Sequence, residues 1–241
     1  KCDSRVFVII SDALRYEVAA SLAEQLRRET QSSVDLKSMC GIFPSITPYG
    51  MAALLPHKQL SVVEKTVGGL SVLADGQPTD SLNRGKVLKA TNVNSVALQY
   101  KNIIGMKKAE RHPLVKGMDV VYIYHDKIDE ASHTSDSAVF PACNDAIDEI
   151  KNLVRIIVNE FGGTRIFITA DHGFLYTYSP LTEDDKVSKN SWGGKEVEYG
   201  RRYCIMRKDA KPDFLQPVLF LGGNTDYTAF APKENVRIKM N

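Results

Sequence analysis

The chain has 241 residues, of which 43% are hydrophobic and 25% are charged, and its formal net charge is +2. These are ordinary values for a globular protein, and the near-balanced charge does not call for nucleic acid or a membrane as a partner. No apolar run reaches the roughly 18 residues of a membrane-spanning helix, so we expect no membrane association.

The chain starts with Lys1 and not with methionine, so we expect it to be a piece of a longer protein. Its cysteines are scattered and contain no C-x-x-C pair. That pattern is typical of reduced thiols in a cytoplasmic protein and not of a disulfide framework. The four cysteines are Cys2, Cys40, Cys143 and Cys204.

The first 55 residues alternate between strand and helix patterns. Residues 5–11 form a continuous apolar run rich in β-branched side chains, which predicts a strand buried on both faces, as in a parallel sheet. Apolar residues then recur every four positions over 14–26, which predicts a helix. We expect a second strand at 34–40, then the loop 41–48, then a short helix at 50–55.

Residues 60–118 are less regular. We expect short strands near 61–64, 71–74 and 95–98 and helices near 83–90 and 105–112.

The pattern sharpens again in the second half. Residues 119–124 predict another buried strand, followed by an acidic loop at 125–136. An amphipathic helix is expected at about 138–161, where Gly162 and Gly163 end it. Residues 165–170 predict a third buried strand that runs into Asp171.

The last part of the chain is polar. We expect a less regular insertion near 179–216 with a hairpin around 196–206, and closing strands at 217–222 and 235–239. The alternation of strands and helices predicts one α/β domain over 1–241, with a largely parallel central sheet and helices on both faces. Ligands of such sheets lie at the carboxyl ends of the strands.

Acidic side chains follow three of the predicted buried strands. Asp12 follows the first, Asp126 and Asp129 follow the second, and Asp171 with His172 follows the third. Gathered carboxylates repel one another and lose hydration, and a divalent metal ion relieves both costs. A mixture of imidazole and carboxylate ligands suits zinc, manganese or iron better than calcium.

Two further features complete the candidate site. The spacing of Asp129 and His133 places both side chains on one face if the segment is helical, whereas His133 in a loop would be solvated. Ser45 and Thr47 offer hydroxyls just before a short helix. Such a hydroxyl is either a nucleophile facing a metal ion or a helix cap.

In chain order, Asp12, the loop 44–48, Asp129 and the run 171–173 resemble the alkaline phosphatase superfamily. More narrowly, four stretches resemble PglZ domains, and the resemblance extends over roughly 5–240. The four stretches are residues 11–17, 119–125, 168–176 and 200–203.

The resemblance implies an alkaline-phosphatase-like fold and two divalent metal ions, zinc or, as the second choice, manganese. It implies Thr47 as the nucleophile. The implied ligands of the first ion are Asp12, Thr47, Asp171 and His172. The implied ligands of the second ion are Asp129 and His133.

Two features of the chain depart from the family pattern. The second metal of the family takes one more histidine near the carboxyl end, whereas no histidine follows His172 here. Many PglZ domains also have an acidic residue in the position of His133. We therefore expect a chain truncated at its carboxyl end, with an incomplete second metal site.

The function implied is that of a cytoplasmic metal-dependent phosphohydrolase in a bacterial phage-defence or signalling protein. Its expected substrates are phosphodiesters such as nucleotides or oligonucleotides. Guanidinium groups bind phosphoryl oxygens well, although each such arginine is alternatively solvated or salt-bridged. The candidates are Arg15, Arg201 and Arg202.

The alternative function is that of an assembly or interaction module with little turnover, as part of an anti-phage defence complex or of a response regulator. A basic stretch would be its docking face, or else a solvated helix face: Lys107, Lys108, Arg111 and Lys116. Aromatic residues near the predicted site would form a platform for a base, or else pack in the core: Tyr16, Tyr49, Phe174 and Tyr176.

Overall fold

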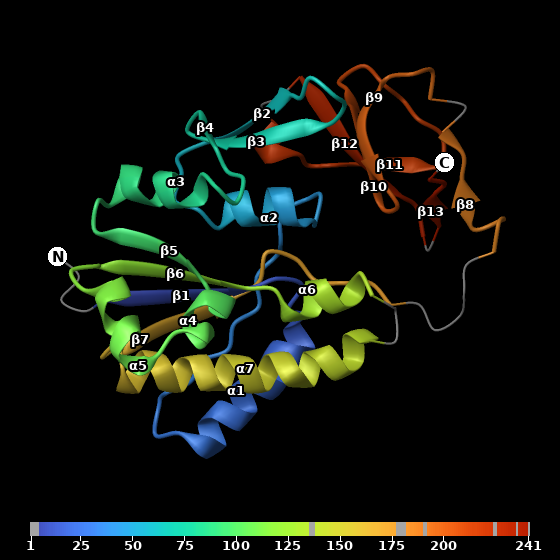
Figure 1. Ribbon diagram of the computed structural model, residues 1–241. Helices are drawn as coiled ribbons and strands as arrows, with labels where there is room; N and C mark the ends of the chain where they lie inside the picture. Colours follow the sequence, from blue (N-terminus) through green and yellow to red (C-terminus); the bar gives the residue numbers. More distant parts are fainter. Residues whose placement is uncertain are drawn as a thin grey trace. The chain divides into compact units, whose positions relative to one another are not determined.

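The computed structural model describes residues 5–134, 138–176, 182–189, 192–223, 226–234 and 236–240. The chain forms two compact units, each of them discontinuous in sequence. The first unit consists of residues 1–41 and 81–174, and the second of residues 42–80 and 175–241. Figure 1 shows the elements of both units.

The first unit is built on a parallel sheet with the strand order β5-β6-β1-β7. Its strands are β1 (Val6–Ser11), β5 (Ser95–Gln99), β6 (Val120–His125) and β7 (Arg165–Thr169). These positions confirm the strands expected at 5–11, 95–98, 119–124 and 165–170. The burial expected for 165–170 is wrong, because β7 lies at the edge of the sheet and has no buried residue. The two central strands, β6 and β1, carry the continuous apolar runs because neighbours cover them on both sides.

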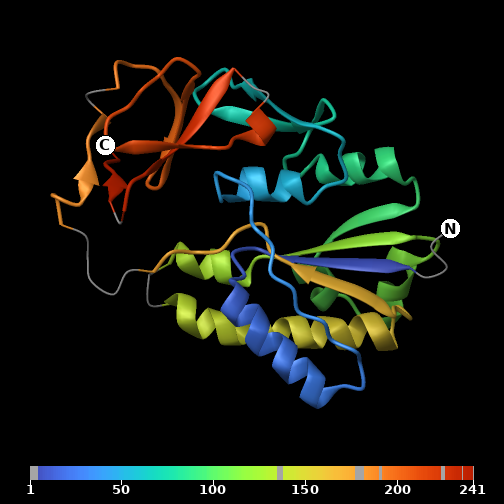
Figure 2. The same ribbon diagram turned by 180° about the vertical axis from the view of Figure 1, so that it is seen from behind.

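Helices flank this sheet, which confirms the predicted α/β class. In Figures 1 and 2, α1 (Tyr16–Glu29) and α7 (Val139–Asn159) lie side by side. α7 confirms the long amphipathic helix, and its buried side chains complete the core of the sheet, which includes Phe7, Ile9 and Ile123. The other helices of the unit are α3 (Arg84–Thr91), α4 (Tyr100–Gly105), α5 (Lys108–Arg111), the 3-10 helix η1 (His112–Val115) and α6 (Lys127–Ser132).

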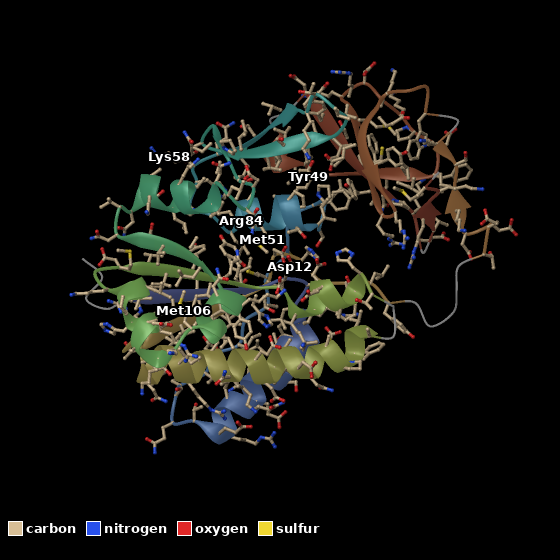
Figure 3. The ribbon with its side chains drawn as sticks, in the orientation of Figure 1. Asp12, Tyr49, Met51, Lys58, Arg84 and Met106 are labelled. Carbon is tan, nitrogen blue, oxygen red and sulfur yellow. The ribbon has the colours of Figure 1, made fainter. Side chains whose placement is uncertain are left out.

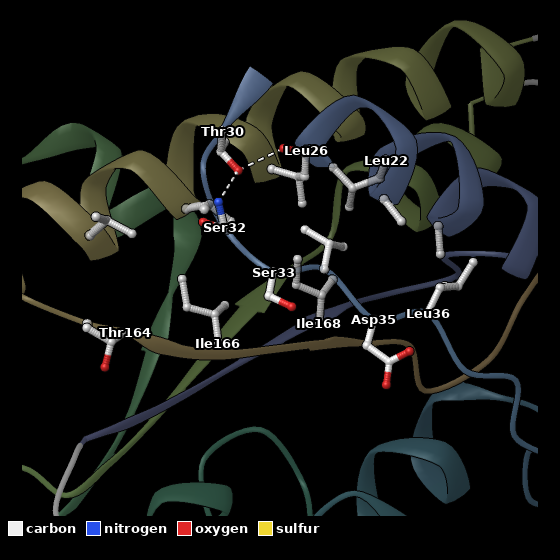
Figure 4. A pocket seen from close by; sticks show the side chains of 16 residues that line it. Leu22, Leu26, Thr30, Ser32, Ser33, Asp35, Leu36, Thr164, Ile166 and Ile168 are labelled. Atoms are coloured by element: carbon white, nitrogen blue, oxygen red, sulfur yellow. Dashed lines mark hydrogen bonds between the residues drawn. The ribbon is translucent and has the colours of Figure 1, made fainter. Parts of the chain in front are cut away.

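The strand expected at 34–40 is wrong. This segment runs without strand pairing, because an alternating pattern forms a strand only where another strand offers its backbone. Val34 instead accepts a hydrogen bond from Nε of Arg27 at 3.1 Å. The segment borders a cavity of about 370 Å³ between α1, α7 and β7 (Figure 4), where Leu26 and Ile168 are among the lining side chains.

Two helix expectations also need correction. The acidic segment 125–136, expected as a loop, contains α6, because Asp129 and Glu130 lie in its first turn, where the helix dipole favours negative charge. The helix expected at 105–112 is instead divided, since α4 ends at Gly105, α5 spans only 108–111, and η1 follows.

The second unit is mainly antiparallel. Its larger sheet has the order β11-β12-β10-β9, a smaller sheet has the order β2-β3-β4, and β8 pairs with β13 in parallel. The elements are α2 (Thr47–Ala53), β2 (Leu60–Glu64), β3 (Leu70–Ala74), β4 (Gln77–Pro78), β8 (Lys186–Val187), β9 (Glu196–Gly200), β10 (Tyr203–Arg207), β11 (Leu215–Val218), the 3-10 helix η4 (Leu221–Gly223), β12 (Tyr227–Pro232) and β13 (Arg237–Ile238).

This unit confirms the strands near 61–64 and 71–74 and the hairpin around 196–206. The strand expected at 217–222 is wrong beyond Val218, because Gly222 has a φ of 75° and the chain turns into η4. Within 235–239 only 237–238 form a strand, and residue 235 lies outside the described residues. Neither segment pairs with the parallel sheet. Across the described ranges, no helix combines the length and apolar character needed to cross a membrane.

Candidate metal centre

Asp12 and Asp171 follow two adjacent parallel strands. Asp12 comes directly after β1, where Figure 3 labels it, and Asp171 comes two residues after β7 ends. β1 and β7 pair in parallel, so their carboxyl ends meet at one edge of the sheet. Both residues are buried, and with His172 they form a group whose potential ligand atoms all lie within 4.8 Å of one another.

The hydrogen bonding of His172 shows which of its ring nitrogens carries a proton and which faces the two carboxylates. Nδ1 of His172 lies 2.7 Å from the carbonyl oxygen of Gly173, and a carbonyl can only accept, so Nδ1 carries a proton. In the neutral ring, Nε2 then presents a lone pair. That nitrogen lies 3.1 Å from Oδ1 of Asp12 and 3.6 Å from Oδ2 of Asp171. Three acceptors therefore converge, and only a proton or a cation between them is stabilising.

The buried carboxylate oxygens also indicate that a proton or a cation is required between the side chains. Oδ1 of Asp12 and Oδ2 of Asp171 are buried without a donor unless the imidazole is protonated. Burial, together with the charge of Asp12, raises the pKa of Asp171 to about 6. Burial opposes charge on His172, but its contact with Asp12 and the charge of Asp171 raise its pKa to about 9. Without a metal ion the group holds protons, and a divalent cation fits this donor set.

The backbone next to Asp12 is unusual. Ala13 has a φ of 63°, a left-handed conformation that costs a residue with a Cβ roughly 1–2 kcal/mol. Its N–H points to Oδ1 of Asp171 at 3.4 Å. The conformation thus turns the chain so that the residues after β1 contact the carboxylate after β7. Strained backbone of this kind is common at functional sites.

Asp129 and His133 form a separate pair. Asp129 lies in the first turn of α6 and His133 is its C-cap, so the helical spacing brings Nε2 of His133 within 3.2 Å of Oδ2 of Asp129. The imidazole side chain is 78% exposed. Among the described residues, neither side chain joins the group of Asp12, Asp171 and His172. Asp126, the first acidic residue after β6, instead pairs with Lys101 at 3.1 Å.

Thr47 and Ser45 belong to the second unit. Thr47 is the first residue of α2, and Ile46 occupies the N-cap position, so neither hydroxyl residue is the cap. Ser45 is exposed and Thr47 is half-buried. Capping, the alternative role that the sequence left open for these hydroxyls, is therefore wrong.

The three candidate arginines have different surroundings. Arg15, in the first unit, forms an ion pair with Glu17 and lies over the ring of Phe174, 5.0 Å from its centroid. Arg201 and Arg202 form the turn between β9 and β10 in the second unit. Arg202 donates to the carbonyl of Val236 at 3.0 Å, whereas Arg201 is exposed.

Some residues that the sequence suggested for an aromatic platform or a docking face instead have structural roles. Tyr49 is fully buried in the core of the second unit, so it packs and does not form an exposed platform. Arg111 donates to the carbonyls of Ile103 and Met106 and pairs with Glu160, which removes it from any docking face.

A buried polar triad was missed by the sequence patterns. Oγ of Ser11 lies 2.9 Å from Nδ1 of His125, and Nε2 of His125 lies 2.9 Å from Oε2 of Glu149. Burial lowers the pKa of His125, although Glu149 opposes the effect. Ser11 and His125 are register partners at the ends of β1 and β6, and that position at two strand ends was the available signal. Glu149, on α7, gave none.

Comparison with known proteins shows the family of the chain. The family described as the BREX system PglZ alkaline phosphatase-like domain matches residues 1–241. The chain is 40% identical over 213 residues to alkaline phosphatase-like protein BrxZ of Escherichia coli O9:H4 (strain HS), covering 87% of this chain and 24% of that protein. It is 38% identical over 190 residues to alkaline phosphatase-like protein PglZ of Bacillus cereus (strain H3081.97), covering 78% of this chain and 22% of that protein.

The chain thus spans about a quarter of the length of these relatives. The family match extends over all its residues, and the parallel sheet with acidic residues at its carboxyl edge agrees with it. This chain belongs to the PglZ family of alkaline phosphatase-like domains.

Proposed function

We propose that this domain is a divalent-metal-dependent phosphohydrolase that acts on phosphodiesters of nucleotides or oligonucleotides in a bacterial phage-defence protein. The observation that carries the proposal is the convergence of Asp12, Asp171 and His172. Their potential ligand atoms lie within 4.8 Å of one another, and the group includes the buried Oδ1 of Asp12 and Oδ2 of Asp171. Membership of the PglZ family supports the reaction class.

Each residue of the group has a proposed role. Asp12, Asp171 and His172 would hold one ion, with Thr47 as its fourth ligand, and Asp129 with His133 would hold another. When bound, zinc or manganese supplies Lewis-acid stabilisation of the charge that develops on phosphoryl oxygens. Hydrogen bonding of His172 to Gly173 orients its Nε2 toward Asp12 before any ion arrives.

Thr47 is the proposed nucleophile. Its hydroxyl would attack phosphorus, release the leaving alcohol and form a covalent phosphoryl or nucleotidyl threonine, which water then hydrolyses. Two features support this role: its place as the first residue of α2, where Ile46 and not Thr47 occupies the N-cap position, and the family to which the chain belongs. Arg15, Arg201 and Arg202 are the proposed partners of the non-bridging oxygens.

The test is hydrolysis of bis-p-nitrophenyl phosphate by the purified chain with added ZnCl₂ or MnCl₂. We expect turnover in wild type and a loss of about 10³-fold or more in Thr47→Ala. Ser45→Ala is the matched control, because it removes an exposed hydroxyl from the same loop and should leave turnover unchanged.

Two results would contradict the proposal. Equal activity of wild type and Thr47→Ala would remove the threonine from the mechanism. If wild type is inert both alone and as part of the full-length protein, with either metal, the domain is an assembly module and not an enzyme.

A further inference from the structure

We propose that Ser11, His125 and Glu149 form a positioning triad that holds Asp12 in its ligand geometry. The inference rests on the proposed metal centre and adds three residues that are not ligands. The triad connects three elements at the carboxyl edge of the parallel sheet, because Ser11 ends β1, His125 ends β6 and Glu149 lies on α7.

The directions of the two hydrogen bonds follow from the groups involved. The carboxylate of Glu149 can only accept, so Nε2 of His125 donates to it across 2.9 Å. The neutral ring then has its lone pair on Nδ1, where the hydroxyl of Ser11 donates across 2.9 Å. Every polar atom of the imidazole is occupied, so the ring and the serine rotamer are fixed together.

The triad is not a second nucleophilic site. Ser11 is 0% exposed and His125 is 1% exposed, so no substrate can reach the hydroxyl. Packing alone does not explain it either, since burying polar groups costs free energy that apolar side chains of similar size avoid. A buried polar network at this place is therefore better explained by the precision it imposes.

The triad acts on Asp12 through the backbone. Ser11 precedes Asp12, and the N–H of Asp12 donates to the carbonyl oxygen of His125 at 2.7 Å. His125 thus holds the residue before the ligand through its ring and the ligand itself through its carbonyl. On the other side, the N–H of Ala13 reaches Asp171 at 3.4 Å. The peptide groups around Asp12 are fixed on both sides, as a preorganised metal ligand requires.

Lys127 supports the outer end of the triad. Its Nζ lies 3.3 Å from Oε1 of Glu149 and 3.3 Å from Oδ2 of Asp145. Glu149 is therefore held by two partners, one through each carboxylate oxygen. Asp145 contacts Lys127 but not His125 in any described interaction, which makes it a useful control position.

The experiment measures the affinity of the metal-stripped chain for Mn²⁺ by isothermal titration calorimetry with MnCl₂. We expect Ser11→Ala and Glu149→Ala to weaken binding by about 10-fold, the usual effect of removing a residue that orients a ligand. Glu149→Gln keeps an acceptor for Nε2 of His125 and should restore most of the affinity.

Two control variants separate positioning from general destabilisation. Ser95→Ala removes another buried serine of the same sheet whose hydroxyl has no partner in the structure. Asp145→Asn removes a carboxylate partner of Lys127. Both should bind Mn²⁺ like wild type. If Ser11→Ala does not fold, the difference in Mn²⁺ affinity between Glu149→Ala and Glu149→Gln still tests the positioning role.

The outcomes distinguish the two proposals. If wild type binds Mn²⁺ and both Ser11→Ala and Glu149→Ala bind it equally well, the positioning triad is wrong and the metal centre stands. The same holds if the control variants weaken binding as much as the triad variants do. If wild type binds no Mn²⁺ and no Zn²⁺, the metal centre is wrong and the triad loses its role with it.

Discussion

The hydroxyl of Tyr203 donates a 3.0 Å hydrogen bond to Oε1 of Glu198 in the second unit. The hydroxyl of Tyr49 approaches the same oxygen at 3.4 Å, and the N–H of Leu70 donates to Oε2 at 2.7 Å. Burial, followed by the charge of Glu198, raises the pKa of both tyrosines, so both hydroxyls remain donors. One carboxylate thus connects α2, which begins with Thr47, to β3 and to the β9–β10 hairpin.

Replacing this carboxylate should destabilise the second unit. We expect Glu198→Ala to lower the free energy of unfolding by about 3 kcal/mol, because two tyrosine hydroxyls lose their acceptor. Glu198→Gln keeps one acceptor oxygen and should cost about 1 kcal/mol. Urea unfolding of both variants measures the difference. Equal midpoints for the two would show that the hydrogen bonds of Glu198 contribute nothing.

Asp171→Asn should have opposite effects with and without metal. In EDTA at a pH above 6 we expect the variant to be more stable than wild type by about 1 kcal/mol, because burial raises the pKa of Asp171 to about 6 and thus disfavours its charged form in the folded state. With MnCl₂ at 100 times the dissociation constant, wild type should gain about 2.7 kcal/mol and the variant little or nothing. Thermal unfolding in both conditions tests the reversal. A variant that is less stable than wild type in EDTA would contradict the account of the cluster.

The cysteines should differ sharply in reactivity. Burial raises the pKa of Cys204 to about 12, so it remains a thiol at pH 8 to 10, and burial also raises the pKa of Cys143. Only a thiolate reacts with iodoacetamide. Cys40 is exposed and should be labelled before either of them. Peptide mass spectrometry after labelling in native buffer measures each site. Labelling of Cys204 at the rate of Cys40 would contradict its burial.

Gly163 should not tolerate a side chain. A Cβ at this position would lie 2.5 Å from atoms of Ile157 and of Phe7, whose ring stacks on Phe161 at the core. Gly163→Ala should therefore lower the free energy of unfolding by about 1–3 kcal/mol through overpacking. Gly105→Ala is the control, because a Cβ there meets nothing within 4 Å and the residue lies in α4. It should be neutral or stabilising by up to about 1 kcal/mol.

The parallel sheet was predictable because burial on both faces leaves a direct mark on the sequence. β1 and β6, the central strands, are short apolar runs of this kind, whereas the edge strand β7 has a similar run without any buried residue. The segments 34–40 and 217–222 have a similar pattern, but neither forms a strand of the parallel sheet. Whether an alternating or apolar segment becomes a strand depends on a partner that its own residues do not specify.

The site was predictable where its residues closely follow parallel strands. Asp12, Asp171 and His172 come together because parallel strands bring their carboxyl ends to one edge. The contact between His125 and Glu149 was not predictable in this way. Glu149 lies on a helix whose apolar pattern indicates only which face is buried, and a polar residue at the border of that face looks like any solvated one.

The division of the chain has a consequence for synthesis on the ribosome. The strands of the first unit have all emerged by Thr169, whereas the core of the second unit joins Tyr49 and Leu70 to Ile205 and Ala229. Residues 42–80 must therefore wait, with apolar side chains uncovered, until the strands that contain Ile205 and Ala229 have been translated. Nascent chains in that state are the ones that chaperones bind, so the first unit is expected to mature before the second.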